Sequence, residues 1–132
     1  MPHSSKTLAI KRVYEEPAPD DGERILIDRL WPRGLTKEKA GVDLWLKEAA
    51  PSRELRTWFG HDPAKFDEFR RRYEAELAQE PGRSALATLR DHSAQGPVTL
   101  VFAAHDSAHS NAAVLRELLA HPAQSSHSAA RG

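Results

Sequence analysis

The sequence predicts an α/β fold: a single compact domain whose central, mostly parallel sheet is flanked by helices. Two segments, 24–31 and 98–104, carry apolar residues on both alternating faces, as strands buried between two layers do, although Asp28 and Arg29 interrupt the first. Segments with helical spacing separate them, as expected where helices join parallel strands. At 132 residues the chain is too short to supply two cores. We therefore predict one domain over residues 6–121, with disordered tails at 1–5 and 122–132.

Three strands and one ambiguous segment are predicted in chain order. Thr7–Tyr14 is rich in β-branched and aromatic residues and precedes a loop of proline, aspartate and glycine. Arg24–Trp31 and Val98–Ala104 are the two buried strands, and we expect the first of them at the centre of the sheet. Val42–Leu46 is compatible with a strand or a helix. These patterns do not determine the order of the strands.

Five helical segments are predicted between and after the strands. Thr36 and Ser52 are suitable N-cap residues for two short helices, and Gly60 ends the second. Asp62 opens the clearest helix, whose apolar side chains recur at helical spacing: Phe66, Phe69, Tyr73 and Leu77. Its surface is expected to carry ion pairs between residues four positions apart in the sequence: Asp67–Arg71, Glu68–Arg72 and Arg72–Glu76. Two more helices are predicted over 84–91 and from about 107 to 120.

The composition excludes several classes of function. The 19 basic and 19 acidic residues balance, so no overall field favours nucleic acid as a partner. The absence of cysteine excludes a disulfide framework, a thiolate metal centre and a cysteine nucleophile. The amino terminus lacks a signal-peptide core, and the longest apolar run is too short to cross a membrane. We expect a cytoplasmic protein that needs no membrane and no cofactor, as a monomer or a homo-oligomer.

Polar residues follow the two buried strands and form the candidate site. In parallel sheets, ligands bind beyond the carboxyl ends of the strands, where loops and helix amino termini supply polar groups. The loops 31–34 and 105–111 should share one edge of the sheet if both strands run parallel. The candidate residues are Asp28, Arg29, Arg33, Gly34, His105, Asp106, His109 and Asn111. This set suits a small anionic ligand that carries a phosphate or a carboxylate.

Several of these candidates have a defined role in the prediction. Arg29 and Arg33 would bind the anion, and Gly34 would let the backbone approach it closely. His109, expected in the first turn of a helix, would be held neutral by the helix dipole. It would act with Asp106 in proton transfer if the protein is a hydrolase.

Structural explanations compete with these roles. Asp28 and Arg29 could form a paired network that serves the fold alone. Pro32 and Gly34 also fit a tight turn between a strand and a helix. Asp106 fits an N-cap, with His109 completing the polar cap.

Two functions from other classes are also compatible with the residues. The first is a protein-interaction or regulatory module in which Trp45, Trp58 and a charged helix face contact a partner. The second is a metal or haem bound by histidine, because His105 and His109 are four apart and His61 could join them. A metal site requires both histidines on one face, which a loop position for His105 does not provide, so no metal ligand is assigned.

Five motifs carry a resemblance to a known family: the runs 24–35, 43–52, 55–63, 69–73 and 98–111. Within Lys6–Leu119 the chain resembles the YeaO-like family of uncharacterised bacterial proteins, part of domain of unknown function 488. The resemblance implies no established reaction. Wider relatives carry a Cys-His-Arg triplet after the last strand, preceded by a carboxylate. The matching triplet here is Ala108, His109 and Ser110, and His105 takes the place of the carboxylate and of the lysine common in the closer branch.

Overall fold

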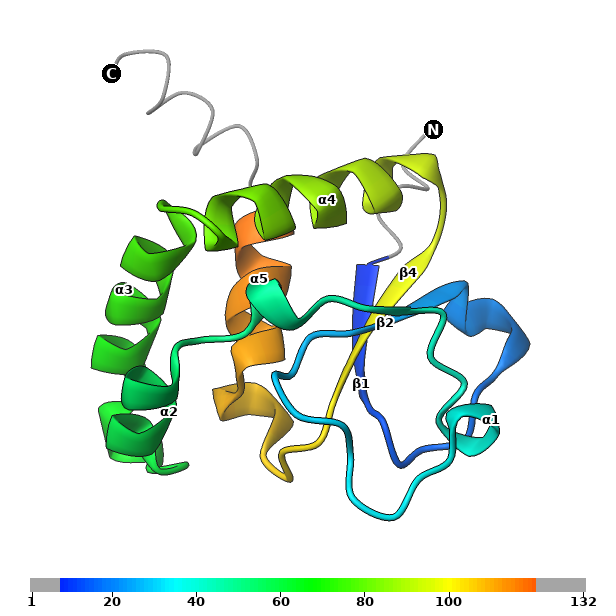
Figure 1. The fold of residues 1–132 in the computed structure, drawn as a ribbon, viewed down its shortest axis with the longest axis horizontal. Coiled ribbons are helices and arrows are strands. Elements are labelled where there is room, and N and C mark those ends of the chain that lie inside the picture. Colours follow the sequence, from blue (N-terminus) through cyan, green and yellow to red (C-terminus); the bar gives the residue numbers. More distant parts are fainter. Residues whose placement is uncertain (1–7, 121–132) are drawn as a thin grey trace.

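The computed structural model describes residues 8–120, and the predicted tails lie outside these residues. At its centre is a four-stranded sheet in the order β1-β4-β2-β3, and every neighbouring pair is parallel (Figure 1). The strands are β1 (Leu8–Arg12), β2 (Glu23–Leu26), β3 (Leu44–Trp45) and β4 (Val98–Phe102). The α/β fold class is confirmed, and β2 is internal as predicted. The ambiguous segment 42–46 contains the short strand β3.

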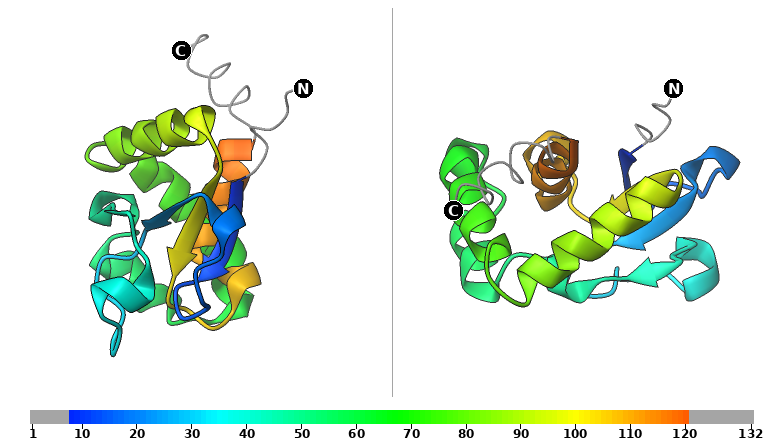
Figure 2. Two further views of the ribbon diagram at one scale, coloured as in Figure 1. Left: turned by 90° about the vertical axis from the view of Figure 1, so that its right-hand side faces the viewer. Right: turned by 90° about the horizontal axis from the view of Figure 1, so that it is seen from above.

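The described residues form five α-helices and four 3-10 turns. The helices are α1 (Lys37–Ala40), α2 (Arg53–Phe59), α3 (Phe66–Leu77), α4 (Gly82–Gln95) and α5 (Asn111–Ala120). The 3-10 turns are Pro19–Asp21, Lys47–Ala49, Pro63–Lys65 and Ser107–His109. Figures 1 and 2 show α3 and α1 at opposite ends of the molecule.

Local capping residues set the helix boundaries largely as predicted. The hydroxyl oxygen of Thr36 accepts a hydrogen bond from the amide of Lys39, and that of Ser52 accepts one from Leu55. Gly60 ends α2 in the left-handed conformation, with φ of 55°. Asp62 is an N-cap, but it opens the 3-10 turn Pro63–Lys65, and α3 follows that turn.

The two faces of the sheet pack against different partners. One face, with Ile25, Leu100 and Phe102, joins the large core formed with α2, α3, α4 and α5. The other face, with Leu26 and Val101, joins a smaller cluster that includes Ala40 of α1 and other residues of the β2–β3 connection. Alternate strand residues point to opposite faces, which explains why both buried segments carry apolar residues at odd and even positions.

Three details of the predicted elements are wrong. The predicted strand over 24–31 ends at Leu26, because side chains replace the next ladder bonds, as described below. The predicted helix from 107 is split into a 3-10 turn and α5, separated by Ser110. The predicted helix over 84–91 is longer at both ends and spans Gly82–Gln95.

The surface ion pairs of α3 also differ in part from the prediction. The Glu68–Arg72 pair is present, with Nε of Arg72 and Oε2 of Glu68 2.8 Å apart. Arg71, however, pairs with Glu68 and not with Asp67. Glu76 faces Ser52 in place of Arg72, because its carboxylate is taken up by the amide and hydroxyl of that residue.

Candidate functional site

The ladder between β2 and β4 is ended by two side chains. The amide of Ile27 still donates to the carbonyl of Val101, at 3.2 Å. The next bond of a parallel ladder would run from the amide of Ala103 to the carbonyl of Ile27. Instead the Asp28 carboxylate accepts from Ala103 at 2.8 Å, and the Asn111 side chain donates to Ile27 at 3.2 Å. Asn111 also donates to Asp28 at 3.1 Å, so the pair satisfies both backbone groups and separates the strand ends.

A pocket lies at the point where the two strands separate. The connection after β2 packs on the face of the sheet that holds α1, whereas the connection after β4 leads into α5 on the opposite face. In open α/β sheets such a reversal at neighbouring strand ends opens a crevice where ligands bind. The pocket here has a volume of about 760 Å³, within the usual range for small-molecule sites.

The two predicted loops do meet in this pocket. Seven of the predicted residues line it: Asp28, Arg29, Arg33, His105, Asp106, His109 and Asn111. Gly34 is not among the lining residues; its φ of 82° shows that it serves the turn, with open space where a side chain would stand.

Other lining residues were not among the residues predicted for an anion site, although His61 was considered as a histidine that could join His105 and His109. Arg56 and Phe59 come from α2, His61 from the turn after it, and Tyr14 from the loop after β1. Helical periodicity places Arg56 on the polar side of a short helix, and nothing local distinguishes it from other surface arginines. Its position follows from how α2 packs over the carboxyl edge of the sheet, which no sequence pattern within α2 encodes.

Three arginines line the pocket without a side-chain partner. Within residues 8–120, the guanidinium groups of Arg29, Arg33 and Arg56 make no hydrogen bond and no ion pair. All three residues are exposed. The backbone at Arg33 is nevertheless anchored, because the Tyr14 hydroxyl donates to its carbonyl oxygen at 3.0 Å. The cations are therefore available to a ligand at little cost in broken contacts.

The two carboxylates of the pocket are already engaged. Asp28 accepts from Ala103 and Asn111, yet burial outweighs these bonds and raises the pKa of this carboxyl above its usual value. Asp106 accepts from the side chain and the amide of His109, at 2.8 and 3.2 Å. The His109 side chain is the main reason that the pKa of Asp106 is lowered. The three arginines outnumber these two carboxylates around the pocket.

His109 occupies a different position from the one predicted. It ends the 3-10 turn before α5, so the expected first-turn dipole of a helix is replaced by the adjacent Asp106 carboxylate. Because an ionised carboxylate can only accept, the Nδ1 atom of His109 carries the proton in this contact. The imidazole also lies edge-on to Phe66, with ring centroids 5.2 Å apart. Its orientation is thus fixed from two sides.

Ser110 has a structural task next to this histidine. Its side chain is buried, at 2% exposure. The hydroxyl donates to the carbonyl of Ser107 at 2.8 Å and accepts from the amide of Ala113 at 3.2 Å. It therefore caps the start of α5, and its hydrogen bonds are already used.

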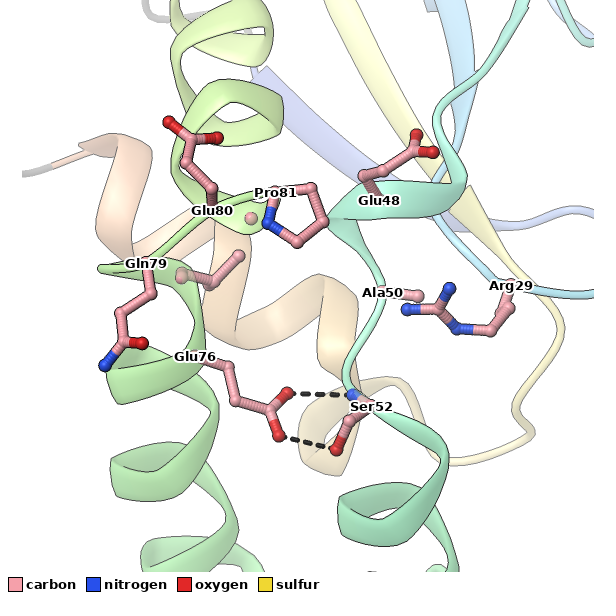
Figure 3. Close-up of a pocket in the computed structure, with 10 residues that line it drawn as sticks. Arg29, Glu48, Ala50, Ser52, Glu76, Gln79, Glu80 and Pro81 are labelled. Atoms are coloured by element: carbon pink, nitrogen blue, oxygen red, sulfur yellow. Dashed lines mark hydrogen bonds between the residues drawn. The ribbon is translucent and has the colours of Figure 1, made fainter.

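A second, smaller pocket of about 250 Å³ adjoins the first, and Arg29 and Ala50 line both. Figure 3 shows the Arg29 guanidinium beside Ala50, with Glu48, Glu76 and Glu80 around the pocket. Glu76 is bonded to the amide and hydroxyl of Ser52 (Figure 3). The acidic lining makes this pocket unsuited to an anion.

The tryptophans of the rival hypothesis are largely covered. Trp45 donates to the carbonyl of Asp28 at 2.8 Å and lies under the Lys47 ammonium. Trp58 lies against Arg72 and Lys65, 4.2 and 5.0 Å from its ring centroid. Both tryptophans are half-buried. They do not form an open aromatic patch.

Residues 8–120 contain neither a metal-binding cluster of side chains nor a membrane-spanning helix. No group of three or more histidine, aspartate or glutamate side chains is arranged to hold a metal ion. No helix in this part of the chain has the length and apolar character to span a membrane.

Fold and site together define an α/β protein with an arginine-lined pocket at the carboxyl edge of its sheet. Residues 7–131 match the family described as the inactive DUF488-N3 subclade, and the chain belongs to this family. It is 48% identical over 112 residues to the uncharacterized protein Rv3073c of Mycobacterium tuberculosis, covering 85% of this chain and 92% of the relative. It is 41% identical to the uncharacterized protein YeaO of Escherichia coli K12, with 85% and 96% covered. The resemblance to YeaO-like proteins is confirmed. No solved structure matches the chain.

Proposed function

We propose that this protein binds a small anionic ligand, one that carries a phosphate or carboxylate, in the pocket between the ends of β2 and β4. The observation that carries the proposal is the gathering of Arg29, Arg33 and Arg56 around one pocket without side-chain partners. Guanidinium groups form charge-assisted, often bidentate bonds to such anions. The family is described as an inactive subclade, which fits a protein that binds without a reaction.

The balance of charge in the pocket supports the same proposal. Hydrogen bonds from Ala103, Asn111 and His109 hold the carboxylates of Asp28 and Asp106 in place but do not remove their negative charge. The three arginines outnumber these two carboxylates, so the pocket keeps an excess of positive charge that favours an anion.

Phosphate titration of single arginine variants tests the proposal. Binding to 15N-labelled protein can be followed at low ionic strength through the indole N–H signal of Trp31, which lines the pocket. Arg33→Ala and Arg56→Ala should each weaken phosphate binding about tenfold, because a charge-assisted bond contributes roughly 1.5 kcal/mol or more. Arg53→Ala is the matched control, because Arg53 is an exposed arginine of α2 that does not line the pocket. Equal affinity in all four proteins would reject the proposal.

Hydrolysis of a phosphoester is the second candidate, and one contact favours it. Nδ1 of His109 lies 2.8 Å from Oδ2 of Asp106, the arrangement by which a carboxylate orients a histidine for proton transfer. In this hypothesis His109 moves the proton, Asp106 positions its ring, and the arginines hold the phosphoryl group.

A sensitive assay separates the two candidates. Hydrolysis of p-nitrophenyl phosphate that is lost in His109→Ala, while phosphate still binds, would establish the second candidate. A rate equal to that in buffer, together with phosphate binding, would leave the protein as a binder.

A further inference from the structure

The pocket is much larger than the anion that its arginines would hold. Its volume of about 760 Å³ equals that of roughly 25 water molecules at about 30 Å³ each. A phosphate or carboxylate group has three to five non-hydrogen atoms and would leave most of this space filled with water. A ligand that fits the pocket must therefore have a further part.

Part of the remaining wall of the pocket is apolar. Among residues 8–120 the exposed large hydrophobic side chains are Tyr14 and Leu30, at 42% and 65% exposure, and both line this pocket. The neighbouring wall consists of Trp31, Pro32, Ala103 and Ala104. Apolar side chains left exposed around a concave site are typical of a surface that a ligand covers.

The apolar wall and the cations are held next to each other. Tyr14 donates its hydroxyl hydrogen to the carbonyl of Arg33, and the Arg12 guanidinium lies 5.1 Å from the centroid of its ring. Leu30 stands in the sequence directly after Arg29, and both line the pocket. The two exposed apolar side chains and the arginines Arg29 and Arg33 thus line the same pocket, with Tyr14 bonded to the backbone of Arg33.

From this juxtaposition we infer that the ligand is an amphipathic anion, in which a phosphate or carboxylate is attached to an apolar, preferably aromatic, body. The arginines bind the charged group, and Leu30, Tyr14 and Trp31 cover the body. This inference rests on the proposed function, since it assumes that an anion occupies the pocket.

Paired ligands that differ only in the apolar body test the inference. Phenyl phosphate should bind at least tenfold more tightly than inorganic phosphate, because covering an aromatic ring removes a large apolar area from water. Phenol, which lacks the anion, should bind at least tenfold more weakly than phenyl phosphate. Benzoate against acetate repeats the comparison for a carboxylate and shows which anionic group the site prefers. In each titration the Trp31 indole signal should shift, whereas that of Trp58, outside the pocket, should not.

A leucine variant locates the apolar contact. Leu30→Asn should reduce the advantage of phenyl phosphate over phosphate severalfold and leave the affinity for phosphate unchanged. Leu30→Met, which keeps an apolar side chain of similar size, should retain the advantage. Because Leu30 is exposed, neither change should disturb the fold.

The possible outcomes separate the two proposals. If phosphate and phenyl phosphate bind equally, the amphipathic ligand is rejected and the anion site stands. If phenol binds as tightly as phenyl phosphate, or if no anion binds, the anion site fails and the inference fails with it.

Discussion

Asp28 joins three parts of the chain through one carboxyl group. Its oxygens bind the end of β4 at Ala103 and the start of α5 at Asn111, while the residue itself follows β2. This arrangement uses both carboxylate oxygens and places the group at the inner wall of the pocket. The structural explanation for Asp28 is thus the one that its contacts favour. Its position in the pocket wall follows from the same bonds.

The half-buried Asp28 predicts a pH dependence of stability. Burial raises the pKa of its carboxyl, so the folded protein holds this proton more strongly than the unfolded chain. The stability that this supplies is complete below the unfolded pKa of about 3.9 and is lost as the pH rises through the raised pKa of the folded state. In Asp28→Asn this loss is absent. The free energy of unfolding of the variant minus that of the wild type should therefore increase with pH across this window.

Urea unfolding at a series of pH values measures this difference. The exposed Asp67→Asn provides the background effect of removing one carboxylate. If the difference for Asp28→Asn does not change with pH beyond that background, burial does not control this carboxyl.

At the scale of elements, α2 is positioned by an N-cap in which a residue of a second helix, α3, takes part. Ser52 accepts from the amide of Leu55, and the Glu76 carboxylate of α3 binds both the amide and the hydroxyl of Ser52. This network holds α2, and with it Arg56 and Phe59, against the pocket.

Removing the Ser52 cap should lower the free energy of unfolding more than removing an N-cap that has no partner in a second helix. We expect Ser52→Ala to cost about 1–2 kcal/mol in free energy of unfolding, because it removes the cap and leaves Glu76 short of a partner. Thr36→Ala, at the exposed cap of the four-residue helix α1, should cost about 0.5 kcal/mol. Thermal or urea unfolding of both variants measures the two costs. Equal losses in free energy of unfolding would mean that the bonds of Glu76 to Ser52 do not contribute to stability.

The end of the β2–β4 ladder gives a second prediction at this scale. Asn111→Ala leaves the carbonyl of Ile27 without its side-chain partner and removes one bond from Asp28. The expected loss is about 1–3 kcal/mol in urea unfolding, the usual cost of an unsatisfied buried group. Asn111→Asp should lose more, because it places a second carboxylate beside Asp28. A larger loss in the alanine variant would contradict this account of the ladder end.

At the scale of the whole molecule, one buried ion-pair network connects several elements at the end of the sheet away from the pocket. Asp21 pairs with Arg24 at 2.8 Å and with Lys11 at 3.0 Å, and its carbonyl accepts from the Thr99 hydroxyl at 2.8 Å. Arg24 is 2% exposed and also donates to the carbonyl of Ala40. The network thereby ties β1, β2, β4 and α1 together.

Asp21 should contribute to stability with the opposite pH dependence from Asp28. Burial alone would raise the pKa of Asp21, but hydrogen bonds from Ala18, Lys11 and Arg24 outweigh it and lower the pKa. Its contribution is therefore present above the unfolded pKa of about 3.9 and is lost as the pH falls through the lowered pKa of the folded state. Asp21→Asn should cost about 3 kcal/mol near neutral pH, because it leaves a buried guanidinium unpaired. The cost should shrink in acid.

Urea unfolding from neutral to acidic pH measures this cost. The neighbouring Asp20→Asn is the control, because Asp20 is exposed. A cost for Asp21→Asn that stays constant into acid would show that the carboxylate is not what Arg24 requires.

Much of the fold could be predicted because its signals are local. The apolar runs, the caps Thr36 and Ser52 and the stripe of α3 each depend on residues a few positions apart. The candidate site was predicted only in part. Its loops follow from the rule for strand ends, but Arg56 and Tyr14 enter the pocket through packing between distant segments.

By itself the sequence determined an α/β domain with two buried strands and polar loops after them. The periodicity of apolar residues and the residue preferences of turns depend only on residues close together in the chain. The tertiary structure alone decided the strand order, the early end of β2 and the set of arginines that meet in one pocket. The bonds of Asp28 and Asn111 span more than 70 residues along the chain. Such contacts exist only once the sheet has brought its carboxyl ends together, so no local pattern could specify them.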